Sequence, residues 1–484
     1  MLHHKKILYC TLLLLVCLFT KAQNSILLNG AATKPLPDTA AKFYVKTIII
    51  KGNKKTKDYI IQREIQFKEG DSIVIANSNL VLEQARQQVY NTTLFSEIKM
   101  ELVVVSAYDI IIVVAVKERW YIYPVPQFKL VDRNFNEWIK TYNASLKRVN
   151  YGLKFVHYNL SGRRDQLRIY LLNGFSRDFS FSYNAPYSNK ALTEGFVIGA
   201  GYSQKKEIPI KTSFSNNLLF YTSDSLRSKF VGSTFYINAG YTIRKGFFSK
   251  HIFNTSFSYL TISDSILLPK NNPTYFNTGK TTAAIFDVTY AYQYANVNNV
   301  FYATKGKTGF VAISKRGLGF TGGTNALSLE ASLTKYYDLG KKWYSNIQLN
   351  GKIRLPLRQA YINQRGLGYG DNYLRGLEYL VIDGTASTLL KSTLKYKVAE
   401  FKIPLPFKLK SLSYIPFTIF AKTYADLGYV YNKKEFAATL NNKLLYTGGF
   451  GIDILTFYDV NLRLEYSFNQ LNQKGLFLHT QSGF

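Results

Sequence analysis

Residues 253–261 read FNTSFSYLT and alternate between two kinds of side chain. One parity is apolar and the other is polar: Phe253, Phe257 and Tyr259 against Asn254, Ser256 and Ser258. Successive side chains of a β-strand point to opposite faces of the sheet, so this stretch predicts a strand with one apolar and one polar face.

The same period of two recurs through residues 120–484, for example over residues 461–468. Aromatic residues make up 15% of the chain, and the mean hydropathy is slightly negative at -0.10. This combination favours a transmembrane β-barrel, with one strand face toward lipid and one toward a wet lumen, over a helical membrane protein. At roughly 23 residues per strand and turn, the region predicts about sixteen antiparallel strands. A soluble β-sandwich could show the same local pattern, but it would not need so many strands.

The N-terminus has the layout of an exported protein. Lysines precede an apolar run over residues 7–19 and then a small-residue cleavage site, which predicts a signal peptide over residues 1–22. A polar linker is expected over residues 23–43. Both cysteines, Cys10 and Cys17, fall in the leader, so we expect no disulfide in the mature protein. No later segment is long and apolar enough for a transmembrane helix, so a membrane role would need a barrel.

Residues 44–119 have a different pattern, which predicts a separate small α+β domain. The expected elements are a strand over 44–53, a helix over 56–67 capped by Thr56, a helix over 77–95, and strands over 96–106 and 109–119. This β-α-α-β-β order resembles a POTRA domain, a periplasmic module that receives polypeptides. Order and length alone would also permit another small α+β domain.

Three features carry the POTRA resemblance. An I-x-I-x-G-N sequence ends the first strand at Gly52 and Asn53, Leu94 and Phe95 close the second helix, and the last strand is very apolar. The resemblance implies that the domain binds unfolded clients by adding a strand to an exposed sheet edge.

A glycine-rich stretch lies inside the barrel region, where residues 365–384 read RGLGYGDNYLRGLEYLVIDG. Its most distinctive part is the tetrapeptide Leu374, Arg375, Gly376 and Leu377. An arginine on a loop within a barrel wall must find an anion or stay hydrated. We therefore expect this loop to fold into the lumen and grip the barrel.

The whole pattern resembles the BamA/TamA-type outer-membrane assembly factors, in which POTRA domains precede a sixteen-stranded barrel. The tetrapeptide matches the V-R-G-F/Y loop signature of that superfamily, with leucines at both flanks, and residues 425–428 match its D-x-G strand. Residues 299–309 sit where the family has a strand after a proline-glycine turn, although the proline is absent here. Residues 121–138 resemble the junction of single-POTRA members from Bacteroidetes.

The resemblance implies that Arg375 pairs with acidic residues of the barrel wall. Within residues 417–431 the polar parity includes Lys422 and Asp426, which makes Asp426 the best candidate partner. Glu400 is a second candidate, but its strand parity is ambiguous. Two roles stay open for the loop, a structural lock and a direct part in handling clients.

Other classes of site and partner have little support in the sequence. The net charge is +31, but the basic residues are dispersed at strand spacing, which fits a basic lumen or anionic lipid headgroups better than nucleic acid. The three histidines after the leader, His157, His251 and His479, are far apart in sequence, so we expect no metal site. No catalytic constellation, nucleotide site or cofactor is expected.

We therefore expect a non-enzymatic protein of the Gram-negative outer membrane that inserts or translocates polypeptides, with its POTRA domain in the periplasm. The expected partners are unfolded outer-membrane or secreted polypeptides, outer-membrane lipids and possible accessory lipoproteins. Two alternatives remain, a porin-like channel and a dedicated secretion pore for one passenger. Secretion pores of this superfamily generally have two POTRA domains and a plug helix, and residues 23–43 show neither.

Overall fold

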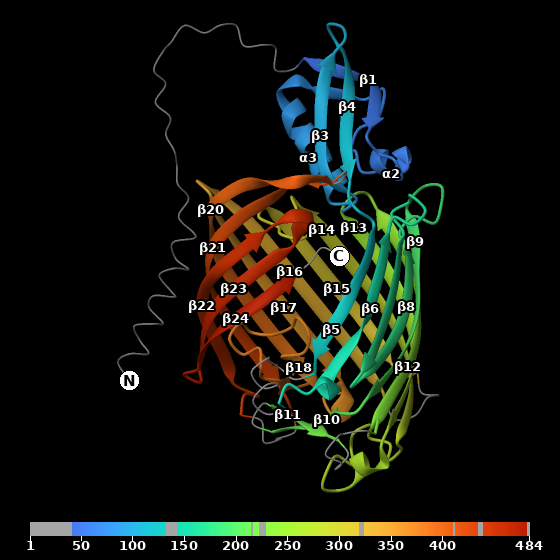
Figure 1. Cartoon of the computed structure of the whole chain (residues 1–484), viewed down its shortest axis with the longest axis vertical. Coiled ribbons are helices and arrows are strands. Elements are labelled where there is room, and N and C mark those ends of the chain that lie inside the picture. The colour runs from blue at the N-terminus through green and yellow to red at the C-terminus, as the bar shows by residue number, and fades with distance from the viewer. Residues whose placement is uncertain are drawn as a thin grey trace.

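The computed structural model describes residues 41–131, 143–213, 216–221, 229–318, 324–409, 412–433 and 439–481. The expected signal peptide, nearly all of the expected linker, residues 132–138 of the expected junction and Phe484 lie outside these ranges. Figure 1 shows a small domain at one end of a large barrel. We call the end of the barrel next to the small domain the near rim and the opposite end the far rim.

The small domain is a four-stranded sheet with helices packed against it. Its elements are β1 (Lys42–Lys51), α2 (Asp58–Gln62), β2 (Ser72–Val74), η1 (Ile75–Asn77), α3 (Ser78–Tyr90), β3 (Phe95–Val104) and β4 (Asp109–Glu118). The strand order is β2-β1-β4-β3, with β1 parallel to β4 and β3 antiparallel to it. The apolar faces of the strands and helices pack together into one core, which includes Val45, Ile61, Ala85, Phe95 and Ile112.

The first helix is shorter than the sequence predicts, and Thr56 does not cap it. The carboxylate of Glu118 accepts both the backbone N–H of Thr56, at 2.7 Å, and its hydroxyl, at 2.7 Å. The helix begins one residue later than a Thr56 cap requires: Lys57 is the N-cap residue, and it has no side-chain bond to the first turn. Ile61 and Ile65 are nevertheless both buried, as their spacing predicts.

The second helix also ends earlier than expected, at Tyr90 instead of at Leu94-Phe95. The chain reverses through Thr93, which has a positive φ of 67°, and Phe95 already pairs with Glu118 as the first residue of β3. Phe95 therefore belongs to the sheet and not to the helix, because it pairs with β4. The short strand β2 was not predicted, because three residues are too few to show a period.

The rest of the chain forms the sixteen-stranded antiparallel sheet that the sequence predicts, curled into a barrel (Figure 1). Its strands are β5 (Ile122–Leu130), β6 (Val149–Tyr158), β7 (Gln166–Gly174), β8 (Arg177–Ala185), β9 (Glu194–Lys205), β12 (Gly232–Lys245), β13 (Ser249–Ile262), β14 (Thr282–Val297), β15 (Gly306–Arg316), β16 (Ala326–Gly340), β17 (Trp343–Leu355), β20 (Ala386–Leu409), β21 (Leu412–Tyr431), β22 (Leu444–Leu455), β23 (Asn461–Asn469) and β24 (Lys474–Gln481).

Apolar side chains alternate to the outside of the barrel, as the period of two requires. Phe253 and Tyr259 of β13 are both exposed, and so are Leu476 and Leu478 of β24. Phe477, between the last two, is only 7% exposed. The phase of the last strand is therefore regular, and its odd-numbered residues point to the lumen.

The two ends of the sheet are β5 and β24, and no pairing joins them among the described strands. We call the junction between β5 and β24 the seam. A space of about 810 Å³ nearby is lined mostly by residues of β5, β6, β7, β8 and β12, with Thr480 from β24.

Shorter elements connect the strands. At the far rim, β10 (Ile208–Ser213) pairs with β11 (Asn216–Phe220) as a hairpin. The glycine-rich segment carries the small pair β18 (Arg365–Leu367) and β19 (Ile382–Asp383). Single turns of 3₁₀-helix are η2 (Leu146–Arg148), η3 (Asp264–Leu267), η4 (Tyr361–Asn363) and η5 (Phe457–Asp459). In the described part of the chain, every helix is too short or too polar to span a bilayer.

Candidate functional site

Arg375 is buried against the barrel wall and bound to Asp426 of β21. Its backbone N–H donates to Asp426 Oδ2 at 3.1 Å, its Nε donates to the same oxygen at 2.9 Å, and its Nη2 contacts Oδ1. Nη1 donates to the hydroxyl of Thr393 at 3.0 Å, and the guanidinium lies 4.0 Å from the ring centroid of Tyr424. Two contacts between one guanidinium and one carboxylate fix the orientation of the Arg375 side chain as well as its distance from Asp426.

The other three residues of the tetrapeptide shape the turn that carries Arg375. Leu374 and Leu377 are buried in an apolar cluster with Leu389 and Val430 of the wall. Gly376 has a positive φ of 90°, and a Cβ at this position would lie 2.8 Å from the Cβ of Ser467 on β23. The site therefore requires glycine for both conformation and space.

The remaining predicted partners lie elsewhere. Lys422 shares the lumenal face of β21 with Asp426, but its ammonium contacts Asp453 and lies 2.6 Å from Glu465 Oε1. Glu400 is largely exposed and pairs with Lys397 at 2.8 Å, so it is not a partner of Arg375. Residues 397 and 399 flank an irregularity in the β20–β21 register, which explains why parity could not place Glu400.

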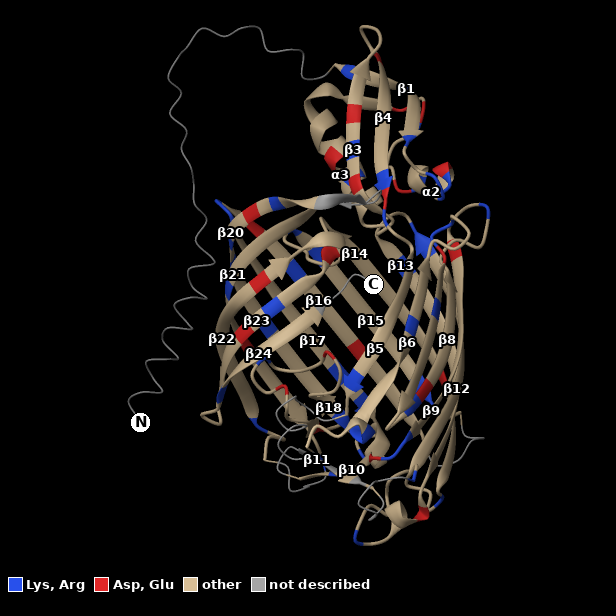
Figure 2. Ribbon diagram, in the orientation of Figure 1, with Lys and Arg blue, Asp and Glu red and all other residues tan. Residues whose placement is uncertain are grey.

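A polar cavity of about 180 Å³ adjoins Arg375 in the lumen. Lys391 and Lys395 of β20 line it, with their ammonium groups 4.5 Å and 4.0 Å from the ring centroids of Tyr373 and Tyr302. Figure 2 shows that basic and acidic residues are spread along the barrel strands and are not gathered on one outer patch. The high charge of the chain is thus partly a property of the lumen.

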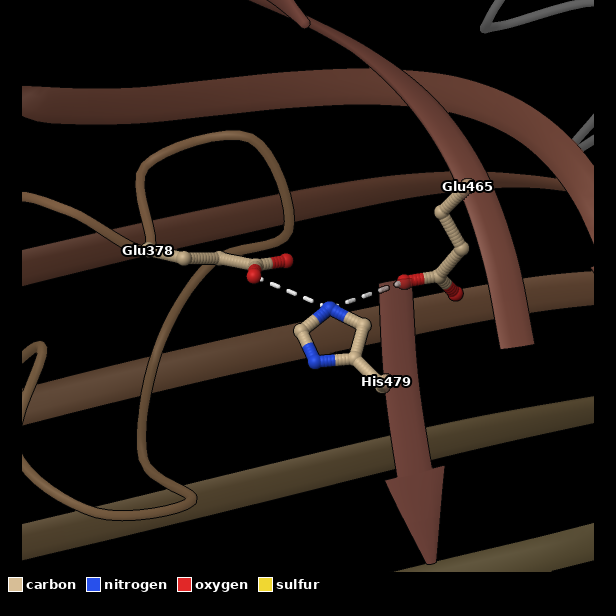
Figure 3. Close-up of side chains that lie close together, drawn as sticks. All are labelled: Glu378, Glu465 and His479. Carbon is tan, nitrogen blue, oxygen red and sulfur yellow. Dashed lines mark ion pairs between the residues drawn. The ribbon is translucent and has the colours of Figure 1, made fainter. Parts of the chain in front are cut away.

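A further lumenal group joins Glu378, Glu465 and His479, which come from the loop, β23 and β24 (Figure 3). His479 Nε2 lies 2.9 Å from Glu378 Oε2 and 3.6 Å from Glu465 Oε2. The sequence prediction treated His479 as an isolated histidine, because its neighbours are far away along the chain.

In the small domain, the motif residues have structural roles. Gly52 has a φ of 92°, and a Cβ there would meet the carbonyl oxygen of Val116 at 2.0 Å. Asn53 donates to the carbonyl of Thr56 at 2.8 Å, which shapes the turn into α2. Leu94 and Phe95 are buried in the domain core.

An ion pair between Glu64 and Arg244 fixes the small domain to the near rim. Arg244, at the end of β12, donates from Nη1 and Nη2 to the two oxygens of Glu64 at 2.5 and 2.6 Å. Tyr187, in the β8–β9 turn, donates to Glu64 Oε1 at 2.6 Å. Burial by itself raises the pKa of Glu64, but the hydrogen bond and charge of Arg244 outweigh it and hold the pKa below its usual value.

A second buried pair fixes the small domain to the other side of the seam. Arg119 Nη2 lies 2.7 Å from Asp459 Oδ2 in η5, between β22 and β23. Tyr90 and Asn299 donate to the other oxygen at 3.1 and 3.0 Å. Burial, followed by the charge of Asp459, raises the pKa of Tyr90 to about 12.

The β6–β7 turn supplies a third contact. Asn159 donates to Thr56 Oγ1 at 2.9 Å, and the backbone N–H of Lys57 donates to the carbonyl of Gly162 at 3.1 Å. Arg164 donates to the carbonyl of Thr92 at 2.9 Å. Together these contacts dock the domain on turns from both halves of the barrel.

Comparisons with known proteins agree with this division. The sequence model of POTRA, described as "Surface antigen variable number repeat", matches residues 43–119. This segment is a POTRA domain. A comparison with the curated proteins finds no match.

The POTRA domain and barrel together are similar to solved structures. CdiB from Escherichia coli is 11% identical with a TM-score of 0.50, and the match covers 93% of this chain and 92% of that one. BamA from Haemophilus ducreyi lacking POTRA domains 1-3 is 13% identical with a TM-score of 0.47, over 91% and 84%. The described chain thus combines one POTRA domain with a sixteen-stranded antiparallel barrel.

Proposed function

We propose that this chain is a non-enzymatic barrel of the Gram-negative outer membrane that assembles, inserts or translocates polypeptides. The observation that carries the proposal is a POTRA domain docked on a sixteen-stranded barrel whose first and last strands do not pair with each other among the described residues. The exposed apolar side chains on the outside of the barrel fit contact with lipid, and the POTRA domain would then lie in the periplasm.

The POTRA domain offers one long free edge for strand addition. In the order β2-β1-β4-β3, the ten-residue strand β3 pairs only with β4, whereas the other edge strand, β2, has three residues. An extended client on β3 would gain backbone hydrogen bonds whatever its sequence. This generality suits a domain that receives many unfolded polypeptides.

Photo-crosslinking can test strand addition directly. A photoreactive amino acid at Val103, which is exposed on β3, should capture unfolded outer-membrane polypeptides. The matched position is Tyr44, which is equally accessible but pairs on both sides, with Ser72 and Asp109. Equal capture at both positions would contradict strand addition at β3.

The seam offers the place where a client strand could enter the wall. The unpaired edges of β5 and β24 present backbone donors and acceptors to an incoming strand. Client folding and lipid distortion would supply the free energy, since the proposal involves no nucleotide. Accessory lipoproteins are possible additional partners.

A porin-like channel is the second candidate. The loop that carries Arg375 is anchored inside the barrel at Asp426, which favours the assembly role over free diffusion. A dedicated pore for one passenger is a narrower form of the translocation role.

The deciding experiment is quantitative envelope proteomics after depletion of the protein, beside cells that carry Arg375→Ala at matched protein level. Glu400→Gln is the control, because it changes an exposed charge outside the Arg375 contacts. A joint fall of several barrel proteins in the depleted and Arg375→Ala cells supports assembly. Loss of one secreted protein alone indicates a dedicated pore, and an unchanged barrel proteome with altered solute uptake would overturn the assembly role.

A further inference from the structure

Three ligand-type side chains meet where the inward loop touches the last two strands. Glu378 directly follows the tetrapeptide, Glu465 lies on β23, and His479 lies on the lumenal face of β24. One ligand atom from each lies within 4.8 Å of the others (Figure 3). None of these residues belongs to the Arg375–Asp426 pair.

Hydrogen bonding alone leaves this group unsatisfied. Glu378 Oε2 and Glu465 Oε2 both approach the same atom, Nε2 of His479, yet among the described residues Nε2 forms no hydrogen bond with acceptable geometry. Glu378 Oε1 is also buried without a hydrogen-bond partner in the described chain. Even a well-oriented imidazole has one proton at Nε2 and could serve only one carboxylate. The side chain of Glu378 is 10% exposed and that of Glu465 is 3% exposed, so water cannot readily compensate.

We propose that Glu378, Glu465 and His479 bind a divalent transition-metal ion of the Zn²⁺ class. One imidazole nitrogen and two carboxylate oxygens are ligands that Zn²⁺ accepts in a tetrahedral site, with water as the fourth ligand. The lumenal cavity is lined by Glu465 and has room for that water. The inference does not depend on the proposed function.

The surroundings hold the ligands in place. Lys422 Nζ lies 2.6 Å from Glu465 Oε1, which leaves Oε2 directed at His479. The ring of Tyr373 stacks on His479 with the ring centroids 6.0 Å apart. Contacts of this kind around a metal site restrict ligand rotation and tune affinity.

Basic neighbours will weaken the site to some degree. Arg463 faces His479 across the β23–β24 pair, and Lys391 lies over the ring of Tyr373.

Metal binding here would join the loop to β23 and β24. The loop is already attached to β21 through Arg375 and Asp426, so the metal would add a second anchor at the strand that forms one edge of the seam. Release of the ion would free β24 from the loop without breaking the Arg375 anchor.

The test is calorimetric titration of Zn²⁺ into the chain without its expected signal peptide, residues 1–22, in detergent, after chelator treatment and dialysis. Leaving out the signal peptide also removes His3 and His4, adjacent histidines that would bind Zn²⁺ themselves. We expect one ion per chain, with affinity at least about tenfold weaker in His479→Asn and in Glu378→Gln. His251→Asn is the control, since His251 lies on β13 beside Tyr290, and it should leave affinity unchanged.

A second measurement keeps the test independent of folding. X-ray absorption of the Zn²⁺-loaded chain should show one imidazole nitrogen among oxygen neighbours, and heat-modifiable migration in gels should show that the metal-free variants are folded. If His479→Asn does not fold, Glu378→Gln, on the loop, carries the comparison. Absence of binding below 1 mM, or equal affinity in the two site variants and His251→Asn, would overturn the proposal.

Discussion

Glu64 of the POTRA domain and Arg244 of the barrel form a two-point ion pair, with Oε1 2.5 Å from Nη1 and Oε2 2.6 Å from Nη2. The two residues are 180 positions apart and both are buried. The pair therefore holds one domain against the other in a defined orientation, which a flexible linker alone would not do.

Removing the charge of Glu64 should undock the POTRA domain from this part of the rim. Glu64→Gln leaves Arg244 buried without a carboxylate, which costs about 3–5 kcal/mol in pairs of this kind. We expect faster hydrogen exchange in α2 and in the β8–β9 turn, measured by mass spectrometry. Glu83→Gln is the control, because Glu83 pairs with Arg86 at an exposed site, and it should leave exchange in these segments unchanged.

The same docking should be sensitive to acid. The pKa of Glu64 is lower in the folded protein, so its contribution to stability is complete above the unfolded value of about 4.3 and is lost as the pH falls through the folded value. Docking should persist at pH 6 and weaken only below about pH 4.3. Hydrogen exchange of α2 across this range checks the prediction, and loss of protection already between pH 7 and pH 6 would contradict it.

Breaking the Arg375–Asp426 pair should destabilise the loop strongly. Arg375→Ala leaves Asp426 buried and unpaired, at a cost of about 3–5 kcal/mol. Adding Asp426→Ala should cost much less than the first change, because no unpaired charge is left. The double-mutant cycle is measured by thermal loss of heat-modifiable migration, and strictly additive effects would mean that the two residues are not coupled.

Two glycines of the loop separate steric from conformational effects. Gly370 has a φ of 59° with open space around its Cβ position, so Gly370→Ala should cost about 1–2 kcal/mol from backbone conformation alone. Gly376→Ala carries the same kind of strain and also meets Ser467, which should add about 1–3 kcal/mol. The measurement is again thermal stability. Equal losses of stability in the two variants would show that Ser467 on β23 moves aside for the added methyl group.

The barrel was predictable because its signal is local and repeated. Each strand carries a period of two, and the same parity argument placed Asp426 on the lumenal face of β21. The helix ends were less predictable, since the chain reverses at Thr93 and Glu118 takes the hydroxyl of Thr56.

The docking contacts and the Glu378 group were missed for a different reason. Their members are brought together only by the complete fold, with as many as 369 positions between Tyr90 and Asp459. One signal was available in the sequence. Glu64 lies between the apolar residues Ile61 and Ile65, and a carboxylate on a face that is otherwise buried needs a partner.

The POTRA domain contacts turns on both sides of the seam, through Arg119 to Asp459 beside β23 and through Thr56 to Asn159 beside β6. The POTRA domain therefore links the two sides of the seam at the near rim, while the described contacts include no such link at the far rim. A client strand or lipid that enters the seam would meet least resistance at the far rim, and β5 and β24 would separate from there toward the near rim. We thus expect the seam to open first at the far rim and last at the near rim, where the POTRA domain holds both sides.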